Sequence, residues 1–192
     1  GGSIWPLAQL EAVADMAHAA GLAVHLDGAR IWNAHVATGI ALAKWCAKAD
    51  TVSVCLSKGL GAPAGSVVAT TRERMKIVRR LRKRVGGGLR QAGVLAAAGM
   101  YALDHHLEKL AGDHQSAKRL AANVPLAWHT PETNILLADV PDAPALVAAA
   151  KTEGVLLSAV SAIRIRAVTH LDFPLAQVEE AAARLRRAAA RL

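Results

Sequence analysis

The sequence has few aromatic residues, although it is rich in other apolar ones. It contains one Phe, one Tyr and four Trp, yet 53% of its 192 residues are hydrophobic and only 20% are charged. Alanine supplies much of the apolar content, which favours many closely packed helices. The length and apolar content are ample for a real core in one or two domains.

Cysteine is also scarce, and long apolar runs are missing. Cys46 and Cys55 form no CxxC pair, so we expect both to be reduced, buried side chains in a cytoplasmic protein. No secretory leader pattern is visible, and no apolar run approaches the roughly 20 residues that span a bilayer. The chain does not open with Met, and we expect it to begin partway through a longer protein.

Charge of one sign predominates. The formal net charge is +8, with arginines concentrated in RRLRKR (79–84) and RLRRAAARL (184–192). Such a balance can indicate a nucleic-acid or membrane partner. No aromatic residues interleave with these arginines, as binding to single strands would require. We therefore interpret them as solvated helix faces and expect neither partner; a basic interaction module is the alternative.

The first part of the chain alternates between helical and strand patterns. Helices are predicted over 6–20, from 29 onward and over 41–47, and strands over 22–26, 51–56 and 65–70. This alternation predicts an α/β layer with a mainly parallel sheet. A charged helix is predicted next over 71–85, and an alanine-rich helix over 89–110.

The character of the sequence changes after residues 123–125. Strands are predicted over 134–140, 155–158 and 163–168, and helices over 143–153 and 174–192. This pattern is typical of a smaller α+β domain. We therefore predict two domains, residues 1–110 and residues 111–192.

Two charged residues come just after predicted strands. Asp27 follows the strand over 22–26, and Lys58 follows the strand over 51–56. Ligands of parallel sheets bind beyond the carboxyl ends of the strands, so both side chains are candidates for one crevice. Burial lowers the pKa of a lysine and makes its amine a better nucleophile for Schiff-base chemistry. Gly59 and Gly61 let the chain turn tightly there and leave room for a flat ligand.

Each of these residues also has a purely structural interpretation. Lys58 could extend to water from a strand end. Asp27 could fix a turn or cap the next helix, whereas the functional interpretation needs a cation such as a protonated pyridine ring. Arg30 lies near a helix N-terminus, where its charge is unfavourable unless it meets a carboxylate. His25 and Asp27 share one strand face, but with no third ligand nearby they do not predict a metal site.

Four blocks in the sequence closely resemble the low-specificity L-threonine aldolases. They are "HLDGARIWNA" (25–34), "ADTVSVCLSKGLGAPAGSVV" (49–68), "GGGLRQAGVLAAAGMYAL" (86–103) and "RAVTHLD" (166–172). These aldolases are fold-type I pyridoxal-phosphate enzymes of the β-eliminating lyase group. The resemblance covers essentially the whole chain, and it implies the large pyridoxal-phosphate-binding domain of that fold followed by a small C-terminal α+β domain.

The resemblance also implies roles for particular residues. The cofactor-binding lysine falls on Lys58, and the acid facing the pyridine nitrogen falls on Asp27. The arginines that hold the substrate carboxylate fall on Arg30 and Arg166, with Arg164 as the competing choice for the second. In relatives, an arginine in the block matched by "GGGLRQ", here Arg90, reaches a cofactor phosphate across a dimer interface; its alternative role is packing at a helix start.

The implied activity is cleavage of L-threonine and related β-hydroxy-α-amino acids to glycine and an aldehyde. Family members extend considerably further at the N-terminus, so we expect this chain to lack the half that carries the phosphate cradle and the general base. We also expect a homo-dimer or homo-tetramer. The alternatives are a β-eliminating lyase acting on another amino acid, and a truncated remnant without catalytic activity.

Overall fold

The computed structural model describes residues 1–191, which form two compact units. The N-terminal unit comprises Trp5–Glu108, and the C-terminal unit comprises the chain from Lys109 onward together with Gly1–Ile4. The predicted division after residue 110 differs from this mainly at the first four residues. These lie along the C-terminal unit, where Thr133 Oγ1 donates a hydrogen bond to the Gly2 carbonyl oxygen at 2.6 Å.

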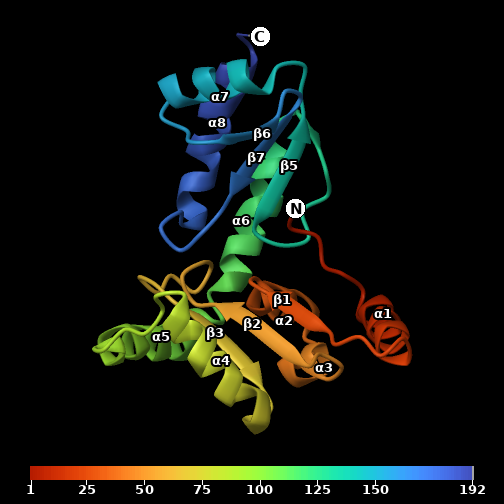
Figure 1. The fold of residues 1–192 in the computed structure, drawn as a ribbon. Coiled ribbons are helices and arrows are strands. Elements are labelled where there is room, and N and C mark those ends of the chain that lie inside the picture. Colours follow the sequence, from red (N-terminus) through yellow and green to blue (C-terminus); the bar gives the residue numbers. More distant parts are fainter. Residues whose placement is uncertain (192) are drawn as a thin grey trace. The chain divides into compact units, whose positions relative to one another are not determined.

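The N-terminal unit contains five helices and three strands among the described residues (Figure 1). In chain order they are α1 (Leu7–Ala19), β1 (His25–Gly28), α2 (Ile31–Thr38), α3 (Leu42–Cys46), β2 (Thr51–Cys55), β3 (Ser66–Thr70), α4 (Arg72–Arg84) and α5 (Ala92–His106). The strands form a sheet of order β1-β2-β3. β1 and β2 are parallel, and β3 returns antiparallel to β2.

The C-terminal unit pairs a four-stranded antiparallel sheet with helices. Its elements are α6 (Leu110–Asn123), β4 (Ala127–Trp128), β5 (Ile135–Asp139), α7 (Ala143–Thr152), β6 (Ser158–Ser161), β7 (Arg164–Val168), the 3₁₀ helix η1 (Leu175–Gln177) and α8 (Val178–Ala189). The strand order is β4-β5-β7-β6. The contiguous core joins α6, α7 and α8 to β5 and β7, and Leu136, Leu146, Ile165 and Leu185 in it are fully buried.

Local sequence explains where several helices begin. Thr71 precedes α4 and Asp142 precedes α7, and each side chain accepts a hydrogen bond from a backbone N–H of the first turn. Such caps satisfy amide groups that have no partner within the helix. α8 carries Val178, Ala182 and Leu185 on one face at helical spacing, and that face is buried.

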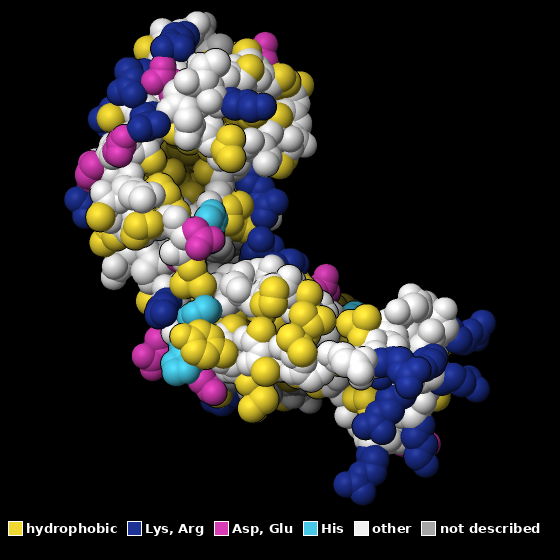
Figure 2. All heavy atoms as spheres, turned by 90° about the vertical axis from the view of Figure 1, so that its left-hand side faces the viewer, with side chains coloured by type: hydrophobic (Ala, Val, Ile, Leu, Met, Phe, Trp, Pro, Cys, Tyr) yellow, Lys and Arg dark blue, Asp and Glu magenta, His cyan; other side chains and the backbone are white. Residues whose placement is uncertain are grey.

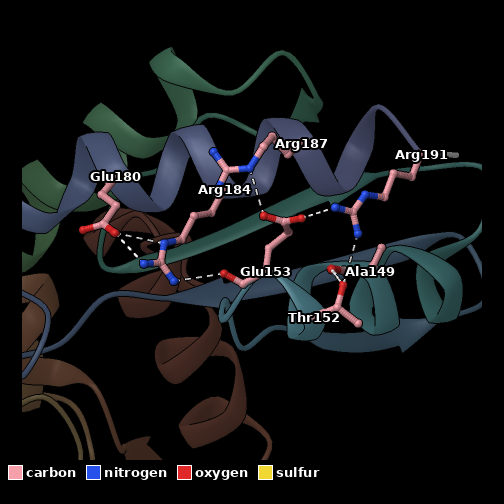
Figure 3. A network of polar contacts seen from close by, with 7 residues as sticks. All are labelled: Ala149, Thr152, Glu153, Glu180, Arg184, Arg187 and Arg191. Carbon is pink, nitrogen blue, oxygen red and sulfur yellow. Dashed lines mark hydrogen bonds and ion pairs between the residues drawn. The ribbon is translucent and has the colours of Figure 1, made fainter.

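An ion-pair network joins the end of α7 to α8 (Figure 3). The Glu153 carboxylate pairs with Arg187 at 2.9 Å and also with Arg191. Arg184 donates to Glu180 and to the Glu153 carbonyl oxygen. The arginine-rich segment 184–192, interpreted from the sequence as a solvated face, therefore also fastens two helices together.

Four details of the predicted structure were wrong. The strand predicted over 22–26 is β1, which begins only at His25 and runs to Gly28. The pattern over 89–110 contains two helices, because the chain turns between α5 and α6 at residues 107–109. The strand predicted over 155–158 begins only at Ser158, since Val155 and Leu157 instead pack against the core from a loop. The two cysteines are free but half-buried rather than buried.

No helix within the described part of the chain is long and apolar enough to cross a membrane.

Candidate functional site

The candidate site lies at one end of the parallel strand pair in the N-terminal unit. Asp27 in β1 is in register with Ser53 in β2, and Lys58 follows three residues after the end of β2. Since the two strands are parallel neighbours, both charged residues belong to the same end of the sheet. Lys58 comes after its strand as predicted, whereas Asp27 lies within β1, which runs over His25–Gly28 rather than 22–26; both side chains are exposed.

One face of this strand pair is polar. His25 and Asp27 alternate along β1, and Thr51 and Ser53 alternate beside them on β2. His25 makes hydrogen bonds to Thr51 Oγ1 at 2.7 Å and to Ser53 Oγ at 3.4 Å. In residues 1–191 no cluster of side chains has the composition of a metal site.

Asp27 has one oxygen engaged in a local turn. Its Oδ1 accepts a hydrogen bond from the Ala29 N–H at 3.1 Å. This bond is the turn-fixing role that the structural interpretation predicted. The N-cap position of α2 is occupied by Arg30, which is half-buried, so Asp27 does not cap that helix. The exposed carboxylate keeps its second oxygen available to a ligand.

The Lys58 loop is held by buried neighbours. The Lys58 carbonyl oxygen accepts the Gly61 N–H at 2.8 Å, and Gly61 has φ +70°, a conformation that favours glycine. Leu60 between them is fully buried, and its carbonyl oxygen accepts a hydrogen bond from His106 Nδ1 at 2.7 Å. No local pattern in the sequence predicts this contact, because its two residues are 46 positions apart.

A second bond fixes the end of β2. The Trp32 indole N–H donates to the Cys55 carbonyl oxygen at 2.9 Å, which ties α2 to the strand that leads to Lys58. Gly28 sits where an added Cβ would come within 3.0 Å of the Ser53 carbonyl oxygen. Backbone and side chains therefore position the strand ends closely, as a site built on rigid elements requires.

The opposite end of the same strands carries a different acid. Asp50 accepts hydrogen bonds from the Val24 N–H at 2.8 Å, from His18 and from Arg74. These bonds, that from Val24 first, hold the pKa of the Asp50 carboxyl well below its usual range. Asp50 is therefore a structural acid that joins elements of the unit, in contrast to Asp27.

The remaining predicted residues lie elsewhere. Arg90 is exposed in the turn before α5. Arg164 and Arg166 alternate along β7 in the C-terminal unit, where Arg164 Nε donates to Asp139 Oδ1 at 2.6 Å. This contact, followed by one from His129, lowers the pKa of Asp139 to about 2. Arg166 makes no ion pair with any residue in the described range, so its guanidinium is the one available to a ligand.

The C-terminal unit has a pocket of its own. It has a volume of about 400 Å³ and hydrophobic walls that include Leu157 and Phe173, with His170 and Arg184 among its polar lining (Figure 2). None of the site residues predicted from the sequence lines it. It therefore adds nothing to the site at the strand ends.

Comparison with known proteins identifies similar sequences. A family model described as "Beta-eliminating lyase" matches residues 1–143. The chain is 39% identical over 194 residues to "Probable low-specificity L-threonine aldolase 2" of Arabidopsis thaliana, covering 93% of this chain and 54% of that protein. It is 40% identical over 190 residues to "Low specificity L-threonine aldolase" of Escherichia coli (strain K12), covering 96% and 56%. The chain thus spans about half the length of these relatives.

Solved structures share the fold. A putative L-allo-threonine aldolase from Listeria monocytogenes matches with a TM-score of 0.79 at 23% identity, over 98% of this chain and 58% of that one. LysN, an α-aminoadipate aminotransferase from Thermus thermophilus complexed with N-(5'-phosphopyridoxyl)-L-leucine, matches with a TM-score of 0.73 at 16% identity, over 97% and 55%. At these identities the likeness shows the fold alone, which is that of fold-type I pyridoxal-phosphate enzymes.

Proposed function

Because the chain belongs to the β-eliminating lyase family, we propose that it supplies the cofactor lysine and substrate arginines of an aldolase. The enzyme would cleave L-threonine and related β-hydroxy-α-amino acids to glycine and an aldehyde. One observation carries this proposal: Asp27 lies near the end of β1, and Lys58 lies just beyond the same end of β2, its parallel neighbour. The names of relatives about 40% identical support the choice of substrate.

The residues at the strand ends fit pyridoxal phosphate. Asp27 offers an exposed carboxylate oxygen beyond the one bound to the Ala29 N–H, as a pyridinium nitrogen requires. Lys58 is an exposed amine in the loop after β2, and Leu60 and Gly61 fix that loop. When bound, the cofactor would supply an electron sink for the pair released from the Cα–Cβ bond. Lys58 would hold its aldehyde carbon, and Asp27 would keep its ring nitrogen protonated.

The substrate carboxylate would be held by Arg30 and Arg166. A guanidinium fork binds a carboxylate with two parallel hydrogen bonds, which fixes the orientation of the bonds at Cα. Arg164 is the weaker choice, because its Nε is engaged by Asp139. Such positioning supplies a large part of the rate in reactions that break one particular bond.

Further details of this function rest on the family resemblance. Arg90 would bind the cofactor phosphate of a second copy, so the active protein would be a homo-dimer or homo-tetramer. Its exposed place before α5 leaves the side chain accessible for this contact. We further propose that the protein acts in the cytoplasm, in amino-acid metabolism.

Product analysis tests the reaction. The purified chain, incubated with pyridoxal phosphate and L-threonine, should release glycine and acetaldehyde in equal amounts. Lys58→Ala should abolish this release. Lys48 pairs with Asp15 at the surface, so Lys48→Ala should leave the release unchanged. Pyruvate or another α-keto acid with ammonia would instead identify a β-eliminating lyase. A chain that binds no cofactor and releases neither product would be non-catalytic.

The two arginines of β7 can be separated in the same assay. Arg166→Ala should raise the threonine concentration needed for half-maximal rate, because it removes a carboxylate contact. Arg164→Ala should affect stability through the lost Asp139 pair and leave that concentration nearly unchanged. The reverse pattern would assign the carboxylate to Arg164.

A further inference from the structure

The pocket of the C-terminal unit has an apolar part. Its hydrophobic walls come from α6, from the loop between α7 and β6, and from the segment after β7, and they enclose about 400 Å³. Leu120 is buried, whereas Val155, Leu157 and Phe173 are half-buried beside the core. Pockets of this size that combine apolar walls with a few polar groups typically bind small molecules. The apolar part would accept a hydrophobic group of such a ligand.

A paired cation and anion on α8 line the same pocket (Figure 3). Arg184 donates to Glu180 Oε1 from Nε at 3.1 Å and from Nη2, and to the Glu153 carbonyl oxygen from Nη1 at 3.1 Å. A guanidinium has five N–H donors, so these three bonds leave two of them for a ligand. The second oxygen of the Glu180 carboxylate accepts no hydrogen bond from the described residues. Both members of the pair can therefore still bind a ligand.

Two further lining residues favour binding beside this pair. An added Cβ at Gly154 would come within 2.8 Å of Arg184 Nη1, so the glycine leaves the space next to the guanidinium open. His170 Nδ1 accepts the Asp172 backbone N–H at 3.3 Å, which places the proton of the neutral imidazole on Nε2. Within residues 1–191 this Nε2–H has no hydrogen-bond acceptor, and it is a further donor for a ligand oxygen.

These groups match a small molecule that carries both charges. We propose that the pocket binds a free α-amino acid with an apolar side chain. Its carboxylate accepts hydrogen bonds from Arg184 and His170, and its ammonium donates to the free oxygen of Glu180. Its side chain lies against Leu157 and Phe173. A simple carboxylate would meet the Glu180 charge without compensating for it, whereas a zwitterion complements both members of the pair.

This proposal goes beyond the aldolase function, because no residue of the proposed catalytic site lines the pocket. It is tested without pyridoxal phosphate, so either proposal can fail alone. L-Phenylalanine is the probe, since an aromatic ring packs favourably against Phe173. Isothermal titration calorimetry on the whole chain should show one molecule bound per chain.

Two analogues test the need for both charges. The probe 3-phenylpropanoate lacks the ammonium group, and 2-phenylethylamine lacks the carboxylate. Each should bind at least about tenfold more weakly than L-phenylalanine, because one charged group of the pocket then loses its ligand partner. An analogue that binds as tightly as L-phenylalanine, or L-phenylalanine binding that does not saturate in the millimolar range, would overturn the proposal.

Substitutions on α8 locate the binding. Arg184→Met keeps the apolar stem but removes the donors, and it should weaken L-phenylalanine binding at least about tenfold. Glu180→Gln should weaken it by only about threefold, because that carboxylate is 65% exposed to water. Glu179→Gln is the matched control and should have no effect, since Glu179 pairs with Arg119 and does not line the pocket. Unchanged affinity in Arg184→Met would contradict the proposal.

One more variant separates the pocket from the proposed substrate site. Arg166 lies on β7 but does not line the pocket, so Arg166→Ala should bind L-phenylalanine as the wild type does. Arg184→Met also loses its bonds to Glu153 and Glu180, and circular dichroism should show that it is folded. The analogue series uses the wild type and does not depend on that variant. Binding that is weakened by Arg166→Ala and not by Arg184→Met would place the amino acid in the substrate site and overturn the proposal.

Discussion

The two units differ in how completely each covers its own hydrophobic residues. Among residues 1–191, the C-terminal unit contains 17 of the 26 buried hydrophobic residues, and the N-terminal unit contains nine. Of the 18 large hydrophobic residues that are exposed in the described part of the chain, 13 belong to the N-terminal unit and five to the C-terminal one. The C-terminal unit therefore encloses more of its hydrophobic residues, whereas the N-terminal unit, which carries Asp27 and Lys58, leaves more of them exposed.

This contrast agrees with the division of roles proposed for the two units. A site on parallel strand ends needs exposed charged residues on a rigid frame, and Leu60 and Trp32 provide that frame with few buried side chains. The chain also spans about half the length of its curated relatives. Comparing substitutions in the two units should therefore separate residues that stabilise the fold from residues that serve the site.

The largest expected difference is between a core residue and an exposed one. Leu185→Ala removes a fully buried side chain from the C-terminal core and should lower the free energy of unfolding by about 2–5 kcal/mol. Met100→Ala removes a mostly exposed side chain and should change the stability of the monomer by no more than about 0.5 kcal/mol. Denaturant unfolding at a protein concentration that keeps the chain monomeric provides the measurement. Equal losses would show that the two units are equally well packed.

A buried acid should make the C-terminal unit depend on pH. Asp113 is 4% exposed, and its Oδ2 has no hydrogen-bond partner among the residues described. Burial raises the pKa of Asp113 to about 6, although the nearby His170 acts in the opposite direction. Between about pH 4 and 6 the folded state then binds more protons than the unfolded one, so stability falls as the pH rises.

The variant Asp113→Asn should remove this dependence. A shift of about two pKa units corresponds to at most roughly 3 kcal/mol. The unfolding free energy of the wild type, measured relative to the variant, should therefore decline by up to that amount from pH 4 to pH 7. A difference that stays constant over this range would show that the Asp113 carboxyl titrates normally.

Loss of the hydrogen bond between His106 and the Lys58 loop should lower the free energy of unfolding by an intermediate amount. His106→Ala leaves the Leu60 carbonyl oxygen without its partner and should cost about 1 kcal/mol in the N-terminal unit. It should also weaken retention of pyridoxal phosphate, because the loop that carries Lys58 loses a restraint. His105→Ala, at an exposed neighbouring position, should do neither. Cofactor retention can be followed by the visible absorbance after dialysis; equal retention by both variants would exclude a positioning role for His106.

The smallest change in the free energy of unfolding is expected from the ion-pair network between α7 and α8. Glu153→Gln removes a carboxylate that pairs with both Arg187 and Arg191 and should destabilise the protein less than Leu185→Ala does. Glu180→Gln serves for comparison, because among the described residues the Glu180 carboxylate pairs only with Arg184. Because these pairs lie at the surface, added salt should reduce the loss caused by Glu153→Gln. A loss that is insensitive to salt would contradict an ionic contribution.

The sequence predicts the site residues better than it predicts the contacts that hold them in place. Asp27 and Lys58 stand out because a charge follows a short apolar run; the structure has Asp27 within β1 and Lys58 beyond the end of β2, its parallel neighbour. The His106 bond to Leu60 has no local pattern, since it joins residues 46 positions apart. The break between α5 and α6 was missed because residues 107–109 contain neither Gly nor Pro. Likewise, nothing in Gly1–Ile4 indicates that this segment packs with the C-terminal unit.

The central claim is that Lys58, in the loop after the strand that pairs with the Asp27 strand, binds the aldehyde of pyridoxal phosphate. Borohydride reduction of the chain with stoichiometric cofactor, followed by peptide mass spectrometry, tests it most directly. The account predicts one phosphopyridoxyl group per chain, located on Lys58, with much lower incorporation in Asp27→Ala. Labelling spread over surface lysines such as Lys44 and Lys151, and unaffected by Asp27→Ala, would contradict it.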